Sequence, residues 1–324
     1  MSKIKKIAVF TSGGDAPGMN AAVRAVVRTA VNNNLEVIGI NRGYQGMIEG
    51  EFVSMDSRSV MNIIQRGGTI LKTARSKEFR TPEGRKKAYD NLIKHEIDAV
   101  VVIGGDGSFT GAGVFSNDYD IPFVGIPGTI DNDMFGTDFT IGFDTALNTV
   151  TETIDKIKDT ANSHNRTFFV EVMGRDAGFI ALQAGIATGA EMVLIPEIDG
   201  QEEKLEEFFA NTNYSSNIII VAEGNNIGGA QKLAKMIKEK HNTRGVRVNV
   251  LGHMQRGGSP TAFDRYLASR MGVEAVDALL DNQRSIMIGY TNHDVVHVPF
   301  NKTIKGKRDV GEELIRVNDI LSKK

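Results

Sequence analysis

Short apolar runs rich in Val and Ile recur along the chain and alternate with longer amphipathic stretches. The runs are continuously apolar rather than alternately apolar and polar, which is typical of strands buried on both faces of a sheet. They predict strands at residues 7–10, 37–40, 99–105, 122–126, 168–173, 192–196, 217–224 and 247–253, with weaker candidates at 51–55, 69–73 and 285–290.

Helical patterns lie between these runs, for example at residues 17–34, 144–164, 228–241 and 259–280. The β-α-β order predicts parallel sheets with helices on both faces. The strands are too many for one ordinary sheet, so we expect two α/β domains. Because no Pro/Ser-rich linker marks a boundary, we expect the chain to cross between them inside ordered elements, near residues 140 and 254.

Composition narrows the function classes. The chain has 324 residues, of which 41% are hydrophobic and 24% charged, as in soluble globular proteins. The net charge of -2 gives no basic excess for nucleic acid, and no apolar run approaches the roughly 18 residues of a membrane span. The N-terminal stretch resembles a first strand rather than an export signal. With no cysteine, the chain has no disulfide framework or thiolate metal site, which fits a reducing cytoplasm.

Glycine-rich turns follow two of the predicted strands, where open α/β sheets bind their ligands. Gly13 and Gly14 follow the first strand, and a second group of glycines brackets Asp106 before a helix expected near Ser108. Glycines allow backbone N–H groups to approach phosphates, and the carboxylate could coordinate Mg²⁺ on a nucleotide. Ordinary turn and helix-cap roles stay open as an alternative.

Two carboxylates, Asp131 and Asp133, follow the apolar run in the stretch GIPGTIDND. Burial of a carboxylate is unfavourable unless it is paired or bound to a cation, so we expect both at a rim that faces a ligand. A hydroxyl that attacks a γ-phosphate needs a carboxylate to accept its proton, and Asp131 suits this role. An Asx-turn network is the alternative.

A cationic group completes the candidate chemistry. It consists of four arginines and a histidine that we expect to follow later strands, at or near the strand ends: Arg166, Arg175, Arg247, Arg256 and His253. Guanidinium groups match phosphate oxygens, so the set favours a pocket for a second anion, although each arginine taken singly is explained as well by a solvated surface charge.

Five ordered motifs resemble those of the bacterial ATP-dependent 6-phosphofructokinases, and the similarity covers nearly the whole chain. They are TSGGDAPGMN (11–20), IGGDGS (103–108), PGTIDND (127–133), VMGRD (172–176) and LGHMQRGGSP (251–260). The resemblance implies an α/β fold of two Rossmann-like three-layer domains with mainly parallel sheets and the active site in the cleft between them. The larger, ATP-binding domain would comprise residues 1–140 and 255–304, and the smaller, fructose 6-phosphate-binding domain residues 141–254 and 305–324.

The implied activity is phosphorylation of the 1-hydroxyl of fructose 6-phosphate by Mg-ATP, the committed step of glycolysis, in a cytoplasmic homotetramer with shared active sites. The ATP contacts would be Gly13, Gly14, Arg75, Ser76, Gly105, Asp106, Gly107 and Ser108, with Asp106 binding Mg²⁺. Asp131 would accept the proton, beside Thr129 and Asp133, while Arg75 and Arg175 would stabilise the transferred phosphoryl group. The sugar contacts would be Thr129, Ile130, Asp131, Arg166, Met173, Gly174, Arg175, Glu223, Arg247, His253, Met254, Gln255 and Arg256, with Arg166 and Arg247 reaching in from a neighbouring subunit.

Several alternatives stay open. Pyrophosphate-dependent relatives resemble the ATP users but typically carry Asp where Gly107 stands and Lys where Gly128 stands, so glycine at both positions favours ATP. Another sugar phosphate could serve as acceptor. A binding protein without turnover would need a lost catalytic group, whereas Asp106, Asp131 and Arg175 are all present. NAD-type kinases share a GGDG turn but lack the ordered arginines.

The regulatory site departs from the family pattern. Effector contacts are implied for Arg24, Arg28, Arg58, Lys158, Gly189 and Glu191. However, an arginine expected at Ser57 is displaced to Arg58, Lys158 replaces another, and a lysine-rich turn has become a stretch containing Ser215 and Ser216. Because hydroxyls cannot replace guanidinium or ammonium donors to phosphate, we expect weak or altered binding of ADP or phosphoenolpyruvate.

Overall fold

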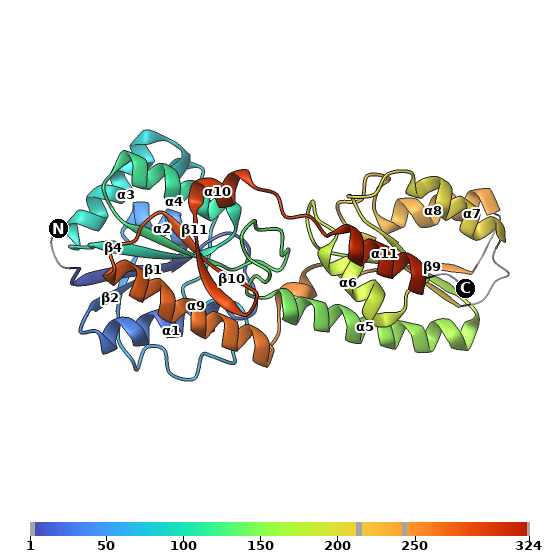
Figure 1. The fold of residues 1–324 in the computed structure, drawn as a ribbon, viewed down its shortest axis with the longest axis horizontal. Helices are drawn as coiled ribbons and strands as arrows, with labels where there is room; N and C mark the ends of the chain where they lie inside the picture. Colours follow the sequence, from blue (N-terminus) through green and yellow to red (C-terminus); the bar gives the residue numbers. More distant parts are fainter. Residues whose placement is uncertain (1–3, 212–215, 242–244, 323–324) are drawn as a thin grey trace. The chain divides into compact units, whose positions relative to one another are not determined.

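The computed structural model describes residues 4–211, 216–241 and 245–322. It divides into two compact units, each made of several chain segments. Unit 1 comprises Met1–Ile130, Met134–Thr145 and Arg256–Arg308, and unit 2 comprises Asp131–Asp133, Ala146–Gln255 and Asp309–Lys324. Each unit is an α/β structure built on one sheet (Figure 1).

In unit 1 the described residues form a seven-stranded sheet in the order β11-β10-β5-β4-β1-β2-β3. The five inner strands run parallel, whereas β3 and β11 pair antiparallel with their neighbours at the two edges. The strands are β1 (Lys6–Thr11), β2 (Glu36–Ile40), β3 (Phe52–Met55), β4 (Ala99–Gly104), β5 (Phe123–Pro127), β10 (Ile286–Thr291) and β11 (Asp294–Pro299).

Helices cover both faces of this sheet (Figure 1). On one face α1 (Met19–Asn32) packs against α9 (Ala262–Leu280) and against the central strands. The other face carries α2 (Gly43–Glu49), η1 (Glu78–Arg80), α3 (Pro82–Lys94), α4 (Asp106–Asp118) and α10 (Phe300–Lys305).

Unit 2 contains, within the described residues, a four-stranded parallel sheet in the order β7-β8-β6-β9. Its strands are β6 (Thr167–Val172), β7 (Met192–Leu194), β8 (Asn217–Ala222) and β9 (Val246–Val250). Helices again lie on both faces (Figure 1): α5 (Phe143–His164), α6 (Phe179–Thr188), α7 (Gln201–Asn211), α8 (Ala230–His241) and α11 (Glu312–Leu321), with the 3-10 helix η2 (Gly252–Arg256) after β9. The predicted α/β class with mainly parallel sheets is therefore confirmed.

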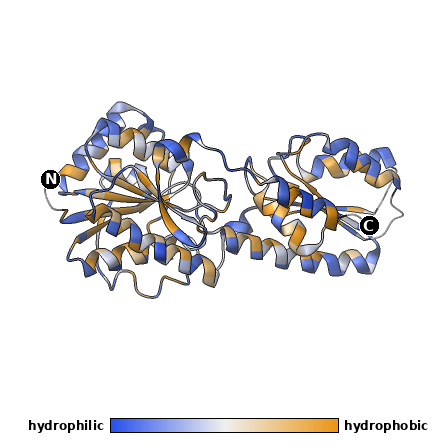
Figure 2. Ribbon diagram, viewed as in Figure 1, coloured by the Kyte–Doolittle hydropathy of each residue, from blue (hydrophilic) through white to orange (hydrophobic). Residues whose placement is uncertain are grey.

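The continuous apolar runs are buried as the sequence predicts. All six residues of β4 and all six of β8 are buried, because helices cover both faces of each sheet. Figure 2 shows this as hydrophobic colour concentrated on the strands and on the inner sides of the helices. Phenylalanines fill much of the core: Phe10, Phe109, Phe115 and Phe123 in unit 1 and Phe169 in unit 2 are completely buried.

Two expectations at the strand level change. The weak candidate at 69–73 is wrong, because the Thr11 hydroxyl lies 2.8 Å from the Thr69 hydroxyl and donates to the Lys72 carbonyl, also at 2.8 Å. These side-chain bonds, together with a left-handed Lys72, hold the segment as a loop. In contrast, the candidates at 51–55 and 285–290 correspond to β3 and β10. The sequence did not predict β11, which follows a two-residue turn in which Asn292 and His293 both have positive φ.

The helix starts are set by local chemistry. The predicted helix 259–280 begins at Ala262 because the Thr261 hydroxyl caps it by accepting the Asp264 N–H at 3.2 Å. The Asp264 carboxylate in turn caps α5, since it accepts the N–H groups of Gly142 and Thr145, each at 2.8 Å.

In the part of the chain described by the structure, no helix has the length and apolar character to span a bilayer.

Candidate active site

The turn after β1 is held against β4. The Ser12 N–H donates to the Ile103 carbonyl at 2.9 Å, and the Thr73 hydroxyl donates to the Gly13 carbonyl at 2.7 Å. Gly13 has a positive φ of 86°. An added Cβ at Gly14 would overlap the guanidinium of Arg256, which also donates to the Asp15 carbonyl at 3.3 Å. The conformation of Gly13 thus favours glycine, and the turn holds a cation beside its backbone at Gly14.

The turn after β4 leads directly into α4. The N–H groups of Ser108 and Phe109 donate to the Gly105 carbonyl at 2.9 and 3.2 Å, which closes the first helical turn. Asp106 is the first residue of the helix and Gly107 is exposed. A Cβ at Gly107 would have no heavy atom within 4 Å. The positive end of the helix dipole and an open backbone together suit a phosphate group.

A single carboxylate at the turn after β4 suits a Mg²⁺ ion that is also bound by substrate phosphates better than a metal ion held by protein ligands alone. Proteins commonly bind this ion through one or two carboxylates, with substrate phosphates and water completing the octahedron. Asp106 supplies such an oxygen beside the N–H groups that could hold the phosphates. The residues present therefore fit magnesium bound together with a nucleotide.

The loop after β5 lies beside the Asp106 turn. Strands β4 and β5 are neighbours, with Gly104 paired to Pro127, and the Gly128 N–H donates to the Gly104 carbonyl at 3.0 Å. The ideal Cβ position of Gly105 is 3.8 Å from Cβ of Thr129. The turns after β4 and β5 therefore lie side by side at one edge of the sheet.

The residues that continue this loop are more enclosed than a rim position implies. Ile130 is completely buried and Asp131 is only 6% exposed, whereas Asp133 is half-buried. Asn132 between them adopts a left-handed conformation with a φ of 55°. This kink places the two carboxylates on a sharply bent backbone rather than on a strand.

Arg75 and Ser76 lie in the loop before η1. The Ser76 hydroxyl donates to Oε1 of Gln45 on α2 at 2.8 Å and accepts the Phe79 N–H at 3.1 Å, while Arg75 is exposed. The Thr73 bond to Gly13 ties the same loop to the β1 turn. Unit 1 therefore brings together the predicted phosphate residues that follow β1, β4 and β5 with the loop that carries Arg75.

In unit 2 a second group of predicted residues lies at the carboxyl ends of β6, β8 and β9. Met173 follows β6, Glu223 follows β8, and His253 lies in η2 after β9. The Arg175 N–H donates to Oε1 of Glu223 at 2.9 Å. Arg175 has a φ of 58° and Gly174 a φ of 140°.

The residues of η2 differ in exposure. His253 and Met254 are exposed, whereas Gln255 is completely buried. Arg256, which ends η2, belongs to unit 1 and lies against the β1 turn described above.

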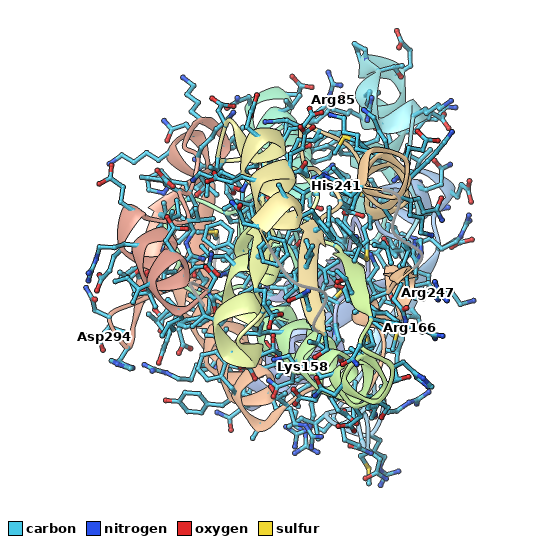
Figure 3. All side chains as sticks on the ribbon, turned by 90° about the vertical axis from the view of Figure 1, so that its right-hand side faces the viewer. Arg85, Lys158, Arg166, His241, Arg247 and Asp294 are labelled. Atoms are coloured by element: carbon cyan, nitrogen blue, oxygen red, sulfur yellow. The ribbon has the colours of Figure 1, made fainter. Side chains whose placement is uncertain are left out.

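Arg166 and Arg247 do not join this second group. Arg166 precedes β6, and Arg247 is the second residue of β9, paired across the sheet with Phe168. Both therefore lie at the edge of the sheet formed by the amino ends of the strands, which is opposite to the edge that carries Arg175, and both are labelled in Figure 3. The expectation that they follow strands is wrong, because Arg166 stands before its run and Arg247 near the start of its own.

The predicted effector residues are distributed over both units. Arg24 and Arg28 lie one turn apart on α1, where desolvation and then the charge of Arg28 lower the pKa of Arg24. Arg58 lies in a turn in which Oδ1 of Asp56 accepts its N–H at 2.9 Å. A bound anion would offset the repulsion between these two arginines and the desolvation that lowers the pKa of Arg24.

In unit 2 two of these residues make contacts within the fold. Lys158, labelled in Figure 3, donates to the carbonyls of Thr188 and Gly189 at the end of α6. Glu191 accepts the Ile218 N–H at 2.7 Å. Of the two serines named above, Ser216 donates to Asn162, and Ser215 lies outside the described residues.

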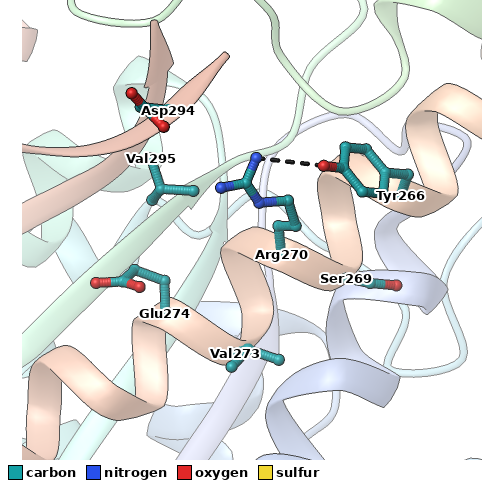
Figure 4. A pocket seen from close by; sticks show the side chains of 7 residues that line it. All are labelled: Tyr266, Ser269, Arg270, Val273, Glu274, Asp294 and Val295. Carbon is teal, nitrogen blue, oxygen red and sulfur yellow. Dashed lines mark hydrogen bonds between the residues drawn. The ribbon is translucent and has the colours of Figure 1, made fainter.

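A surface hollow on unit 1 contains none of the predicted site residues. Figure 4 shows its lining on α9 and β11: Tyr266, Ser269, Arg270, Val273, Glu274, Asp294 and Val295. Arg270 donates to the Tyr266 hydroxyl at 3.3 Å and to the His293 carbonyl at 3.0 Å. No strand-end loop carrying the predicted chemistry contributes to it.

Glycine-rich turns and carboxylates at the carboxyl ends of parallel strands define an α/β protein of the class that binds phosphorylated ligands at the edge of its sheets. The particular family follows from comparison with known sequences. The chain belongs to the phosphofructokinase family, whose model matches residues 6–279.

Individual relatives agree with this assignment. The chain is 56% identical to ATP-dependent 6-phosphofructokinase 2 of Bacteroides thetaiotaomicron over 325 aligned positions, covering 99% of this chain and 100% of the relative. The crystal structure of Pichia pastoris phosphofructokinase in the T-state has a TM-score of 0.86 at 39% identity, covering 94% of this chain and 36% of that chain, so this chain spans about a third of its length. A pyrophosphate-dependent phosphofructokinase from Marinobacter aquaeolei has a TM-score of 0.85 at 22% identity, covering 99% and 92%, and shares the fold.

Proposed function

We propose that this protein is an ATP-dependent 6-phosphofructokinase, which transfers the γ-phosphoryl group of Mg-ATP to the 1-hydroxyl of fructose 6-phosphate. The observation that carries the proposal is the side-by-side arrangement of the turns after β4 and β5, which joins a phosphate-type helix start at Asp106 to the loop that leads to Asp131. The high identity to a relative named as such an enzyme supports the choice of donor and acceptor.

In the proposed reaction the unit 1 turns bind the donor. Backbone N–H groups at Gly105 and Gly107 hold the phosphates beside the side chain of Ser108, Gly13 and Gly14 let the chain approach them closely, and Arg75 and Ser76 complete the ATP site. Asp106 holds the magnesium ion, which supplies positive charge to the phosphate oxygens.

The acceptor needs a base and an anion site. Asp131 takes the proton of the sugar 1-hydroxyl. The hydroxyl oxygen forms a bond to the γ-phosphorus, and the bond from that phosphorus to the bridging oxygen of ADP breaks. Thr129 and Asp133 stand beside Asp131 in the same loop, and the completely buried Ile130 anchors that loop. Arg175 and Arg75 stabilise the charge on the transferred group.

The remaining contacts bind the sugar phosphate. We assign them to Met173, Gly174, Arg175, Glu223, His253, Met254 and Arg256, with Gln255 discussed below. The position of Arg166 and Arg247 at the amino ends of their strands supports their assignment to the site of a neighbouring subunit. A cytoplasmic homotetramer with shared sites, and a modified effector site, belong to the same proposal.

Pyrophosphate is the alternative donor, because a pyrophosphate-dependent phosphofructokinase has the same fold. The absence of side chains at Gly107 and Gly128 favours ATP, because an Asp at 107 would extend into the open space beside the phosphate turn. An added Cβ at Gly128 would lie 3.1 Å from Ile103 and 3.2 Å from Met19, so a larger side chain there would require both to shift.

The test is a coupled assay of wild-type protein with fructose 6-phosphate and either ATP or pyrophosphate, beside the Asp131→Ala variant. We expect turnover with ATP only, and a fall in kcat of roughly 100-fold or more in the variant. Asp138→Asn, which changes a carboxylate later in the same loop, serves as the matched control. Wild-type protein that binds ATP without turnover would refute the proposal, and a nearly intact rate in Asp131→Ala would refute the assigned base.

A further inference from the structure

The loops after β6 and β9 are neighbours at one edge of the unit 2 sheet. The two strands pair in parallel, with Glu171 opposite Val250, and the Leu251 N–H continues the ladder by donating to the Glu171 carbonyl at 3.0 Å. Met173 begins the first loop and Gly252 the second. Parallel neighbours end at the same edge, so a side chain from one loop can reach the backbone of the other.

Gln255 makes this connection. Its Oε1 accepts the Met173 N–H at 3.1 Å, and its Nε2 donates to the Gly252 carbonyl at 3.0 Å. The side chain is completely buried. The acceptor and the donor of the amide therefore both bond to backbone groups, and no surface of the side chain is exposed to a ligand.

The same loop is held from its other side. The Arg175 N–H donates to Glu223 after β8, and an added Cβ at Gly224 would overlap the Arg175 carbonyl. Arg175 adopts a left-handed conformation, which is unfavourable for a residue with a side chain and persists only where the surroundings impose it. Bonds from two flanking loops, to Met173 and to Arg175, supply those surroundings.

We propose that Gln255 is a positioning residue, which holds the backbone of residues 173 to 175 so that the guanidinium of Arg175 meets the sugar phosphate or the transferred phosphoryl group. This inference rests on the proposed function, and it gives Gln255 a role that acts through Met173 rather than by contact with the sugar. Neither a shorter amide nor an apolar side chain of the same length can bond to both loops.

The test compares Gln255→Met with wild type in steady-state assays with ATP and fructose 6-phosphate. The variant keeps the side-chain length but leaves the Met173 N–H and the Gly252 carbonyl without their partner. On the basis of one lost hydrogen bond to a buried N–H group and one to a partly buried carbonyl, we expect kcat/KM for fructose 6-phosphate to fall roughly ten-fold or more, with KM for ATP within about two-fold of wild type. Gln231→Met, an exposed change on α8 of the same unit, is the matched control.

A double-mutant cycle separates positioning from direct contact. If Gln255 acts through the Arg175 loop, Gln255→Met has a much smaller effect in an Arg175→Ala background than in wild type. Equal effects in both backgrounds would overturn the inference, as would wild-type kinetics in the single variant. Wild-type protein without any turnover would refute the proposed function instead, so the two failures are distinguishable.

Hydrogen exchange gives a second measurement that does not depend on turnover. In Gln255→Met we expect faster amide exchange in the peptide containing residues 173 to 176, while peptides from β8 and α8 keep their wild-type protection. Should this variant fail to fold, Gln255→Ala replaces it, because a smaller side chain cannot overpack the site. Unchanged exchange in the folded variant would overturn the inference.

Discussion

The hydroxyl of Tyr44 donates a hydrogen bond to the carbonyl of Ser108 at 2.5 Å. Tyr44 belongs to α2 and Ser108 to the first turn of α4, two residues after Asp106. Burial raises the pKa of the Tyr44 phenol, so the group stays protonated and remains a donor. Its ring stacks on Phe79 with centroids 4.0 Å apart, which fixes its direction. The turn after β4 is thus supported by a side chain 64 residues earlier in the chain.

We therefore predict that Tyr44→Phe weakens the donor site alone. Loss of one buried hydrogen bond is worth about 1 kcal/mol, which corresponds to a rise in KM for ATP of roughly five-fold. KM for fructose 6-phosphate should stay at its wild-type value. The control is Tyr89→Phe, since Tyr89 stacks on Tyr119 away from this turn. Equal changes in both KM values would contradict a role confined to the donor site.

Gly107→Asp should weaken ATP binding without unfolding the protein. The new side chain enters open space and Gly107 does not have a positive φ, so the backbone needs no adjustment. A second carboxylate beside Asp106 repels the triphosphate, and we expect KM for ATP to rise by at least ten-fold, on the order of 1.4 kcal/mol. Val114→Asp, at an exposed position on the same helix, adds the same charge as a control. A KM near wild type, measured in the coupled assay, would show that no phosphate approaches this turn.

The Asp264 carboxyl should make stability depend on pH in the mildly acidic range. Burial, partly offset by the bonds from Thr145 and Gly142, raises the pKa of Asp264 from 3.8 to about 6. Between pH 3.8 and about pH 6 the Asp264 carboxyl binds more protons in the folded state than in the unfolded state. The contribution of Asp264 to the free energy of unfolding therefore falls as the pH rises through this range. The difference amounts to about 3 kcal/mol between pH 3.8 and pH 7.

Urea unfolding of wild type and Asp264→Asn at several pH values between 4 and 7 tests this prediction. The altered helix cap changes the free energy of unfolding of the variant by a constant amount, and the variant lacks the titrating carboxyl group of Asp264. The wild type should therefore gain stability relative to the variant as pH is lowered from about 6. A difference that stays constant, or that shrinks on acidification, would show that the bonds to Thr145 and Gly142 outweigh the effect of burial.

Lys158 should affect stability more than regulation. Its ammonium group bonds to the carbonyls of Thr188 and Gly189, where a cation also interacts favourably with the helix dipole of α6. We predict that Lys158→Met lowers the melting temperature by roughly 1 to 3 °C. Titration of ADP against fructose 6-phosphate turnover should show weak activation in both proteins. Strong activation of the wild type at sub-millimolar ADP would refute the expectation of a weakened effector site.

The strand-end turns were predictable because their signals are local. Gly13, Gly14 and the residues around Asp106 follow apolar runs directly, so their place at the sheet edge follows from the strand itself. Long-range contacts leave no such signal. The sequence of residues 69–73 resembles a strand, but Thr11 and Asn20 provide hydrogen bonds that hold it as a loop. The contacts of Tyr44 with Ser108 and of Gln255 with Met173 join residues that are 64 and 82 positions apart in the chain.

The arginines show a different limit. Arg166, Arg175 and Arg247 all stand close to apolar runs, and composition alone does not distinguish a residue before a strand from one after it. In a parallel sheet this difference decides which edge a side chain reaches. The register of β6 with β9 resolves it, since it places Arg247 opposite Phe168 near the strand start.

The division of the chain between its two units has a practical meaning for protein engineering. The backbone changes unit between Thr145 and Ala146, after the first turn of α5, and it does so again at Gln255 and Arg256 within η2. Neither unit is a continuous stretch of polypeptide, and a cut at either place severs a helix. Expressing one unit alone would therefore demand rejoined segments and new chain ends, and a gene fusion or truncation could not exchange one unit between relatives as a simple cassette.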